Sequence, residues 1–148
     1  MRLPAPGGAT RPSVRHTDRT RGINLDSLQA SLKRSPLLGA LWETFIFSEL
    51  RKNQVFRKGK WELWFWRDQY GLEADFLIHK GGRFALLEAK FTESPSAKEA
   101  APLEKVGSIL GEKNVDELGI MARPKDSFPL TKKVKVISVR DLWLTPPD

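Results

Sequence analysis

The 148-residue sequence contains no cysteine. This absence excludes a disulfide framework and a thiolate zinc site, and it fits a reducing environment. No apolar run approaches the roughly 20 residues that a membrane-spanning helix needs, and the first residues lack the apolar core of a signal peptide. We therefore expect a cytoplasmic protein with no membrane partner.

Several sequence motifs are also missing. There is no G-x-x-x-x-G-K-[ST] phosphate loop, so no ATPase activity is expected from this chain. There is no Gly-x-Ser-x-Gly elbow and no cysteine nucleophile, which argues against covalent catalysis by those groups. The two histidines, His16 and His79, have no partners in the sequence that suggest zinc or a catalytic base.

Positive charge is abundant but unevenly placed. The net charge is +7, and residues 1–36 hold seven Lys/Arg against two Asp, which leaves +7 − 5 = +2 for residues 37–148. The Pro-, Gly-, Arg- and Thr-rich residues 1–22 show no period and are predicted to be a disordered basic tail. Such a tail can bind an acidic surface, although a solvated role is favoured. The globular domain is predicted to cover residues 23–148.

The remaining sequence alternates between helical and extended patterns. Helices are predicted at residues 24–34, 37–52 and 96–110, and strands at 61–67, 72–79, 84–91, 115–121 and 134–139. The helix at 37–52 is apolar around nearly its whole cylinder, which predicts burial on all sides. This order predicts an α/β fold with a mixed central sheet of about four to five strands flanked by helices.

The sharpest local inference concerns the Gly81-Gly82 pair between two predicted strands. A two-residue turn of type I′ or II′ favours glycine, and it would pair Leu77 with Leu86. The same register places Asp75 directly opposite Glu88. A four-residue loop keeps this register, whereas a three-residue loop would break it.

Two opposed acids in apolar surroundings need a compensating charge. Both faces of these strands are largely apolar, as in a central strand that is covered on both sides. Carboxylates placed there require a cation or a shared proton. Lys90 follows Glu88 by two residues on the same face, and Mg²⁺ prefers carboxylate oxygens. The pattern therefore predicts a metal-binding cluster around Asp75, Glu88 and Lys90.

These residues resemble the signature of the PD-(D/E)xK nuclease-like superfamily, in which an Asp is followed by Glu-x-Lys on the next strand. Here the two segments are Glu73-Ala74-Asp75-Phe76 and Leu87-Glu88-Ala89-Lys90, and Ala74 stands where the superfamily motif has its proline. The resemblance implies a restriction-endonuclease-like core. It also implies phosphodiester hydrolysis on DNA by a water that Mg²⁺ or Mn²⁺ activates.

A longer resemblance covers about residues 24–122. The segments GALWETFIFSEL, WFWRDQYGLEADFLI and ALLEAKFTESPS look like the C-terminal domain of unknown function in many prokaryotic AAA-type ATPases. Those proteins carry an ATPase module first, and that module is missing here. The chain is then a fragment or a split part of such a protein, and a separate ATPase is an expected partner.

The resemblance also implies a role for each matching residue. Asp75 and Glu88 would bind the metal, with the carbonyl of Ala89 as a further ligand. Lys90 would orient the attacking water and stabilise charge on the phosphate. Glu43, on the first core helix, would hold the metal or its waters.

Less specific interpretations stand beside this one. A ladder of charges from Glu73 to Lys90 and from Lys90 to Glu88 would satisfy each group without a metal. The domain could also be a catalytically inactive module that binds nucleic acid or protein, or a remnant of a longer gene. Three tryptophans, at positions 61, 64 and 66, could stack on bases, but we expect them in the core.

Overall fold

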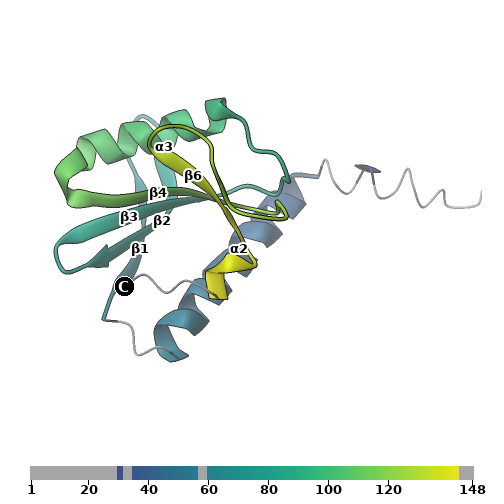
Figure 1. Ribbon diagram of the computed structural model, residues 1–148, viewed down its shortest axis with the longest axis horizontal. Helices are drawn as coiled ribbons and strands as arrows, with labels where there is room; N and C mark the ends of the chain where they lie inside the picture. Colours follow the sequence, from purple (N-terminus) through teal and green to yellow (C-terminus); the bar gives the residue numbers. More distant parts are fainter. Residues whose placement is uncertain (1–29, 32–34, 57–59, 144–148) are drawn as a thin grey trace, which may run out of the picture.

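The computed structural model describes residues 30–31, 35–56 and 60–143. Its centre is a six-stranded mixed sheet with strand order β1-β2-β3-β4-β6-β5, which is more strands than the sequence predicted. Helices α2 and α3 cover opposite faces of this sheet (Figure 1). The predicted tail at residues 1–22 lies outside the described residues, as does most of the predicted helix at 24–34.

Three antiparallel strands form the first half of the sheet: β1 (Glu62–Arg67), β2 (Glu73–Lys80) and β3 (Arg83–Ala89). The predicted two-residue turn between β2 and β3 is confirmed, because Lys80 pairs with Arg83. Gly81 and Gly82 both have positive φ, at 59° and 80°. Glycine adopts these angles without steric cost, so the glycine pair fixes the register of the hairpin.

Helix α3 (Ala97–Leu110) crosses over one face and leads into strands that run parallel to β3. Ser96 caps the start of this helix, and its backbone N–H donates to the Glu99 carboxylate at 2.6 Å. After it come β4 (Val115–Ala122), the short β5 (Phe128–Pro129) and β6 (Val134–Ser138). The strand β5 was not predicted, since two residues carry no recognisable alternation.

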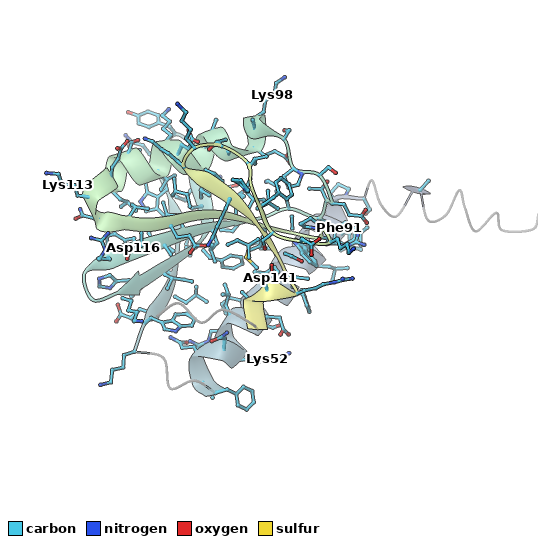
Figure 2. All side chains as sticks on the ribbon, viewed as in Figure 1. Lys52, Phe91, Lys98, Lys113, Asp116 and Asp141 are labelled. Carbon is cyan, nitrogen blue, oxygen red and sulfur yellow. The ribbon has the colours of Figure 1, made fainter. Side chains whose placement is uncertain are left out.

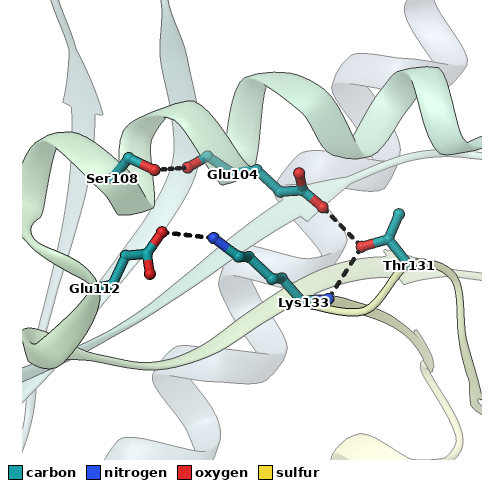
Figure 3. Close-up of polar contacts among 5 residues, drawn as sticks. All are labelled: Glu104, Ser108, Glu112, Thr131 and Lys133. Carbon is teal, nitrogen blue, oxygen red and sulfur yellow. Dashed lines mark hydrogen bonds and ion pairs between the residues drawn. The ribbon is translucent and has the colours of Figure 1, made fainter.

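Polar contacts tie the segment before β6 to α3 (Figure 3). The hydroxyl of Thr131 donates to the Glu104 carboxylate at 2.7 Å and accepts from the Lys133 backbone N–H at 3.2 Å. The Lys133 ammonium forms an ion pair with Glu112, just beyond the helix. These contacts join the segment before β6 to the α3 side of the sheet, and none of them involves a residue of the predicted site.

Helix α2 (Pro36–Phe56) packs on the other face with only one side of its cylinder. Trp42, Ile46 and Leu50 are buried, and the indole N–H of Trp42 donates to the carbonyl of Met121 at 3.0 Å. Large apolar side chains elsewhere on the helix are 41–79% exposed: Leu37, Leu41, Phe45, Phe47, Val55 and Phe56. The prediction that this helix is buried all round is therefore wrong within the described part of the chain.

The prediction that the three tryptophans belong to the core is only partly confirmed. Trp61 is buried on the α2 side, and Trp66 packs on the α3 side. Trp64 is 58% exposed, because β1 is an edge strand that pairs only with β2. Among the described residues, no helix has both the length and the apolar character needed to cross a bilayer.

Candidate functional site

A β-bulge in β2 sets the position of Asp75. The β1–β2 ladder pairs Trp64 with Leu77 and Trp66 with Ala74, so β1 advances by two residues while β2 advances by three. Asp75 and Phe76 together face Phe65, and the extra residue breaks the alternation of side chains. Consequently Ala74 packs in the α3-side core and Phe76 in the α2-side core, although alternation would put both on one face.

Because of this bulge, Asp75 lines a hollow between α2 and the edge of the sheet. The hollow has a volume of about 430 Å³. Its walls come from three elements: Glu43, Thr44 and Phe47 of α2, Leu63, Trp64 and Phe65 of β1, and Asp75 and Phe76 of β2. Glu43 and Asp75, which are far apart in sequence, thus meet at one surface.

The predicted direct opposition of Asp75 and Glu88 on one face is not what the structure shows. The β2–β3 ladder ends at the pair Phe76–Leu87, one step before them. Alternation along β3 places Glu88 on the side of Leu86, which belongs to the α3-side core. Both acids nevertheless lie at the same end of the sheet, near enough for the charge of Asp75 to act on Glu88.

Asp75 is held by the backbone of the neighbouring strand. Its Oδ2 accepts a hydrogen bond from the backbone N–H of Ala89 at 2.7 Å. Burial raises the pKa of Asp75 above its ordinary value, and this exceeds the opposing effects of the Ala89 N–H and the Lys90 charge. The carboxylate is thus kept in a place where its charge is costly.

Glu88 and Lys90 form an ion pair at the end of β3. The Lys90 Nζ lies 2.7 Å from Glu88 Oε1, and the side chains are 38% and 13% exposed, respectively. Burial raises the pKa of Glu88, and the negative charge of Asp75 raises it further, despite the bond to Lys90. The two carboxylates are therefore close enough to interact, as the sequence predicted.

The electrostatics of Lys90 follow from the same arrangement. Burial alone would lower the pKa of Lys90, but its bond to Glu88 and the nearby negative charges produce a net rise. Lys90 is accordingly a cation beside two acids. It can neutralise part of their charge and can also face an incoming anion.

Glu43 and Glu73 depart from their predicted surroundings. Glu43 is exposed rather than enclosed in a buried helix, and its pKa is raised by partial burial and then by the charges of Asp75 and Glu73. Glu73 pairs with Arg67 across β1–β2, with Nε and Oε2 3.7 Å apart, instead of extending a ladder to Lys90. Of the predicted charge ladder, the structure shows the Lys90–Glu88 contact.

The fit to a divalent metal rests on two carboxylates. Within the described residues, no group of three or more His, Cys, Asp or Glu side chains is arranged to hold a metal ion. Mg²⁺, however, is commonly held by one or two carboxylates together with waters and substrate phosphates. Asp75 and Glu88 match that smaller requirement, because their mutual repulsion and burial leave negative charge for a cation to compensate.

Aromatic residues lie around the site, some of them in the core and some exposed. The Arg123 guanidinium lies 4.4 Å from the centroid of the Phe91 ring, and Phe91 meets Trp42 edge-on at 5.7 Å. Phe65 of β1 is 78% exposed beside Asp75. An unpaired edge strand rich in aromatic residues is the signal that could have revealed this exposed group.

Comparison with known proteins gives a family and a few relatives. Residues 38–142 match the model of a domain of unknown function, DUF4143. The uncharacterised proteins Rv2008c of Mycobacterium tuberculosis and Mb2031c of Mycobacterium bovis are each 28% identical over 115 residues. Each match covers 78% of this chain but only 24% of the relative, so the chain spans about a quarter of the length of these relatives.

One solved structure also resembles the chain. It is a refined half-complex from a tetradecameric assembly of Thermococcus gammatolerans McrB AAA+ hexamers with bound McrC. The TM-score is 0.49 at 19% sequence identity, over 68% of this chain and 27% of the matched chain.

Proposed function

This chain belongs to the DUF4143 family, and we propose that it is a metal-dependent nuclease domain with a restriction-endonuclease-like core, which hydrolyses phosphodiester bonds in DNA. The observation that carries the proposal is the cluster of Asp75, Glu88 and Lys90 at one end of the sheet. Burial raises the pKa of both acids, and the Lys90 ammonium lies 2.7 Å from Glu88. Perturbed acids and a cation gathered in this way are typical of functional sites.

Each residue of the cluster has a role in this proposal. Asp75 and Glu88 would hold Mg²⁺ or Mn²⁺, with the Ala89 carbonyl as a further ligand and Glu43 binding the metal's waters. The metal would lower the pKa of a bound water and polarise the phosphate. Lys90 would stabilise the negative charge that develops on the phosphate oxygens. Asp75 is kept in position by the Ala89 N–H.

A second function is supported by the ion pair itself. Because Lys90 already compensates Glu88, the site is also consistent with a catalytically inactive module that binds nucleic acid or protein. In both functions we propose that the chain works with an ATPase module. This part of the proposal rests on the resemblance to the C-terminal domains of AAA-type ATPases.

The test combines thermal melting in Mg²⁺ or Mn²⁺ with cleavage of plasmid and oligonucleotide DNA. We expect saturable stabilisation by the metal in the wild-type protein, and loss of that stabilisation in Asp75→Asn and Glu88→Gln. DNA cleavage should fall by about 100-fold or more in these variants and in Lys90→Ala.

The matched control for this test is Asp116→Asn. Asp116 is an exposed acid paired with Arg83, away from the cluster (Figure 2). Its variant should keep the metal-induced stabilisation and the cleavage rate of the wild type. If metal does not stabilise the protein and DNA stays intact, the nuclease proposal fails and the inactive module is favoured.

A further inference from the structure

We infer that the hollow between α2 and β1 binds an unpaired nucleobase, so that the substrate is single-stranded DNA or a duplex with unpaired ends. This inference rests on the proposed function and specifies its substrate class. The hollow adjoins Asp75, one of the two acids of the proposed metal site. A nucleotide whose phosphate reaches that site would place its base beside the aromatic walls.

Three exposed aromatic residues line the hollow, and one of them is Trp64 of β1, which is 58% exposed. Phe65 is 78% exposed and Phe47 is 48% exposed, and both line the hollow. Leu63 packs in the α2-side core, and Phe65, two residues further along β1, shares its face. Phe76 forms part of the inner surface and is buried. The hollow therefore offers apolar rings on opposite sides, one from the helix and one from the strand.

The bulge brings one ring close to the acid. Asp75 and Phe76 together face Phe65 across the β1–β2 ladder. Neighbouring strands lie about 4.8 Å apart, which is less than the span of one nucleotide. In a regular strand, the Asp75 side chain would lie on the other face of the sheet. The bulge therefore determines both the position of Asp75 and its proximity to Phe65.

The distribution of charge favours stacking over phosphate recognition. Residues 37–148 carry +7 − 5 = +2 in total, and the residues that line the hollow include no Lys or Arg. Duplex binding depends largely on neutralising phosphates with basic side chains. Stacking on aromatic rings needs no such charge, because every base has a π face, but it does require bases that are free of a partner strand.

The experiment measures DNA binding by fluorescence anisotropy with a labelled 12-nucleotide oligothymidylate in Mg²⁺. Glu88→Gln is the parent, so that the oligonucleotide stays intact. We expect Phe65→Ala and Phe47→Ala to weaken binding roughly 5- to 150-fold, the factor for the loss of one base–aromatic stack. A blunt 12-base-pair duplex should bind at least about tenfold more weakly than the single strand.

The matched control is Phe56→Ala. Phe56 is 79% exposed, close to the 78% of Phe65, but it lies at the end of α2 and does not line the hollow. Its variant should bind like the parent. The inference is overturned if the parent does not bind the single strand, if the duplex binds equally well, or if Phe56→Ala weakens binding as much as Phe65→Ala does.

The results also separate this inference from the proposed function. If binding depends on Phe65 but the wild-type protein cleaves no DNA, the result supports the nucleobase site and refutes the nuclease proposal. If cleavage depends on Asp75 but Phe65→Ala is fully active on single strands, the result supports the nuclease proposal and refutes the nucleobase site.

Discussion

At the scale of single residues, Asp75 and Glu88 weaken the fold at neutral pH. Burial raises the pKa of both carboxyl groups. Between the ordinary pKa and the raised one, the folded protein holds protons that the unfolded chain has released. The free energy of unfolding therefore falls as pH rises through this window, and above it the whole cost is present. Such a cost is expected where selection favours function over stability.

We predict from this that Asp75→Asn unfolds at a higher temperature than the wild type at pH 7 without metal, by about 2–5 °C. The asparagine cannot ionise, and its side-chain oxygen can still accept the Ala89 hydrogen bond. The difference should close as pH falls below the ordinary Asp value of 3.8. Thermal unfolding monitored by circular dichroism between pH 3 and pH 8 would measure it.

Asp116→Asn is a control of opposite sign for this prediction. Arg83 lowers the pKa of Asp116, so its carboxylate stabilises the fold above its ordinary pKa, and that contribution is lost as pH falls through the lowered value. Its variant should be slightly less stable than the wild type at pH 7. An Asp75→Asn protein less stable than the wild type under the same conditions would contradict the prediction.

At the scale of elements, helix α2 is held by a single apolar side. Ile46 is fully buried against the sheet, whereas Leu41, five residues earlier, is 54% exposed. We predict that Ile46→Ala lowers the free energy of unfolding by about 2–5 kcal/mol, through reduced burial and a residual cavity. Leu41→Ala should change it by no more than about 0.5 kcal/mol.

Urea unfolding of the two α2 variants would check this prediction. If Leu41→Ala costs as much as Ile46→Ala, the outer side of α2 is covered in solution, as the apolar sequence of the helix predicts. That result would overturn the one-sided packing that the structure shows. Equal m-values for both variants would confirm that the comparison concerns stability alone.

Most elements and the hairpin register were predictable from the sequence, since alternation, caps and a glycine pair are local signals. The position of Asp75 was not, because the prediction assumed strict alternation through β2. The bulge opposite Phe65 breaks that assumption, and nothing in the pattern around Ala74 marks it. The exposure of α2 was also unpredictable, because an apolar helix carries no information on how many layers cover it.

At the scale of the whole molecule, the excess positive charge is separated along the sequence from the proposed site. Residues 1–22 contain five Arg and one Asp, so they supply +4 of the +7. The proposed site, by contrast, combines two acids with one lysine. We propose that the basic N-terminal sequence supplies a non-specific attraction to nucleic acid that does not depend on a metal at the two acids.

We predict that deleting residues 1–22 leaves the melting temperature unchanged and weakens binding to DNA at low salt. A plot of the logarithm of the observed binding constant against the logarithm of the salt concentration should have a shallower slope. For a single strand, the slope should change by about 0.7 for each phosphate that the shortened protein no longer neutralises. Filter binding across a salt series would measure both the affinity and the slope. A lower melting temperature of the shortened protein would show that these residues belong to the folded domain.

The outer row of α2 has a practical consequence. Leu37, Leu41 and Phe45 present apolar side chains to water on successive turns of the helix. Surfaces of this kind adsorb to plastic, bind hydrophobic dyes and limit the concentration at which a protein stays clear. Replacing Leu37 and Leu41 with lysine or glutamate would leave Ile46 and the sheet undisturbed. A sample improved in this way would suit crystallisation and magnetic resonance.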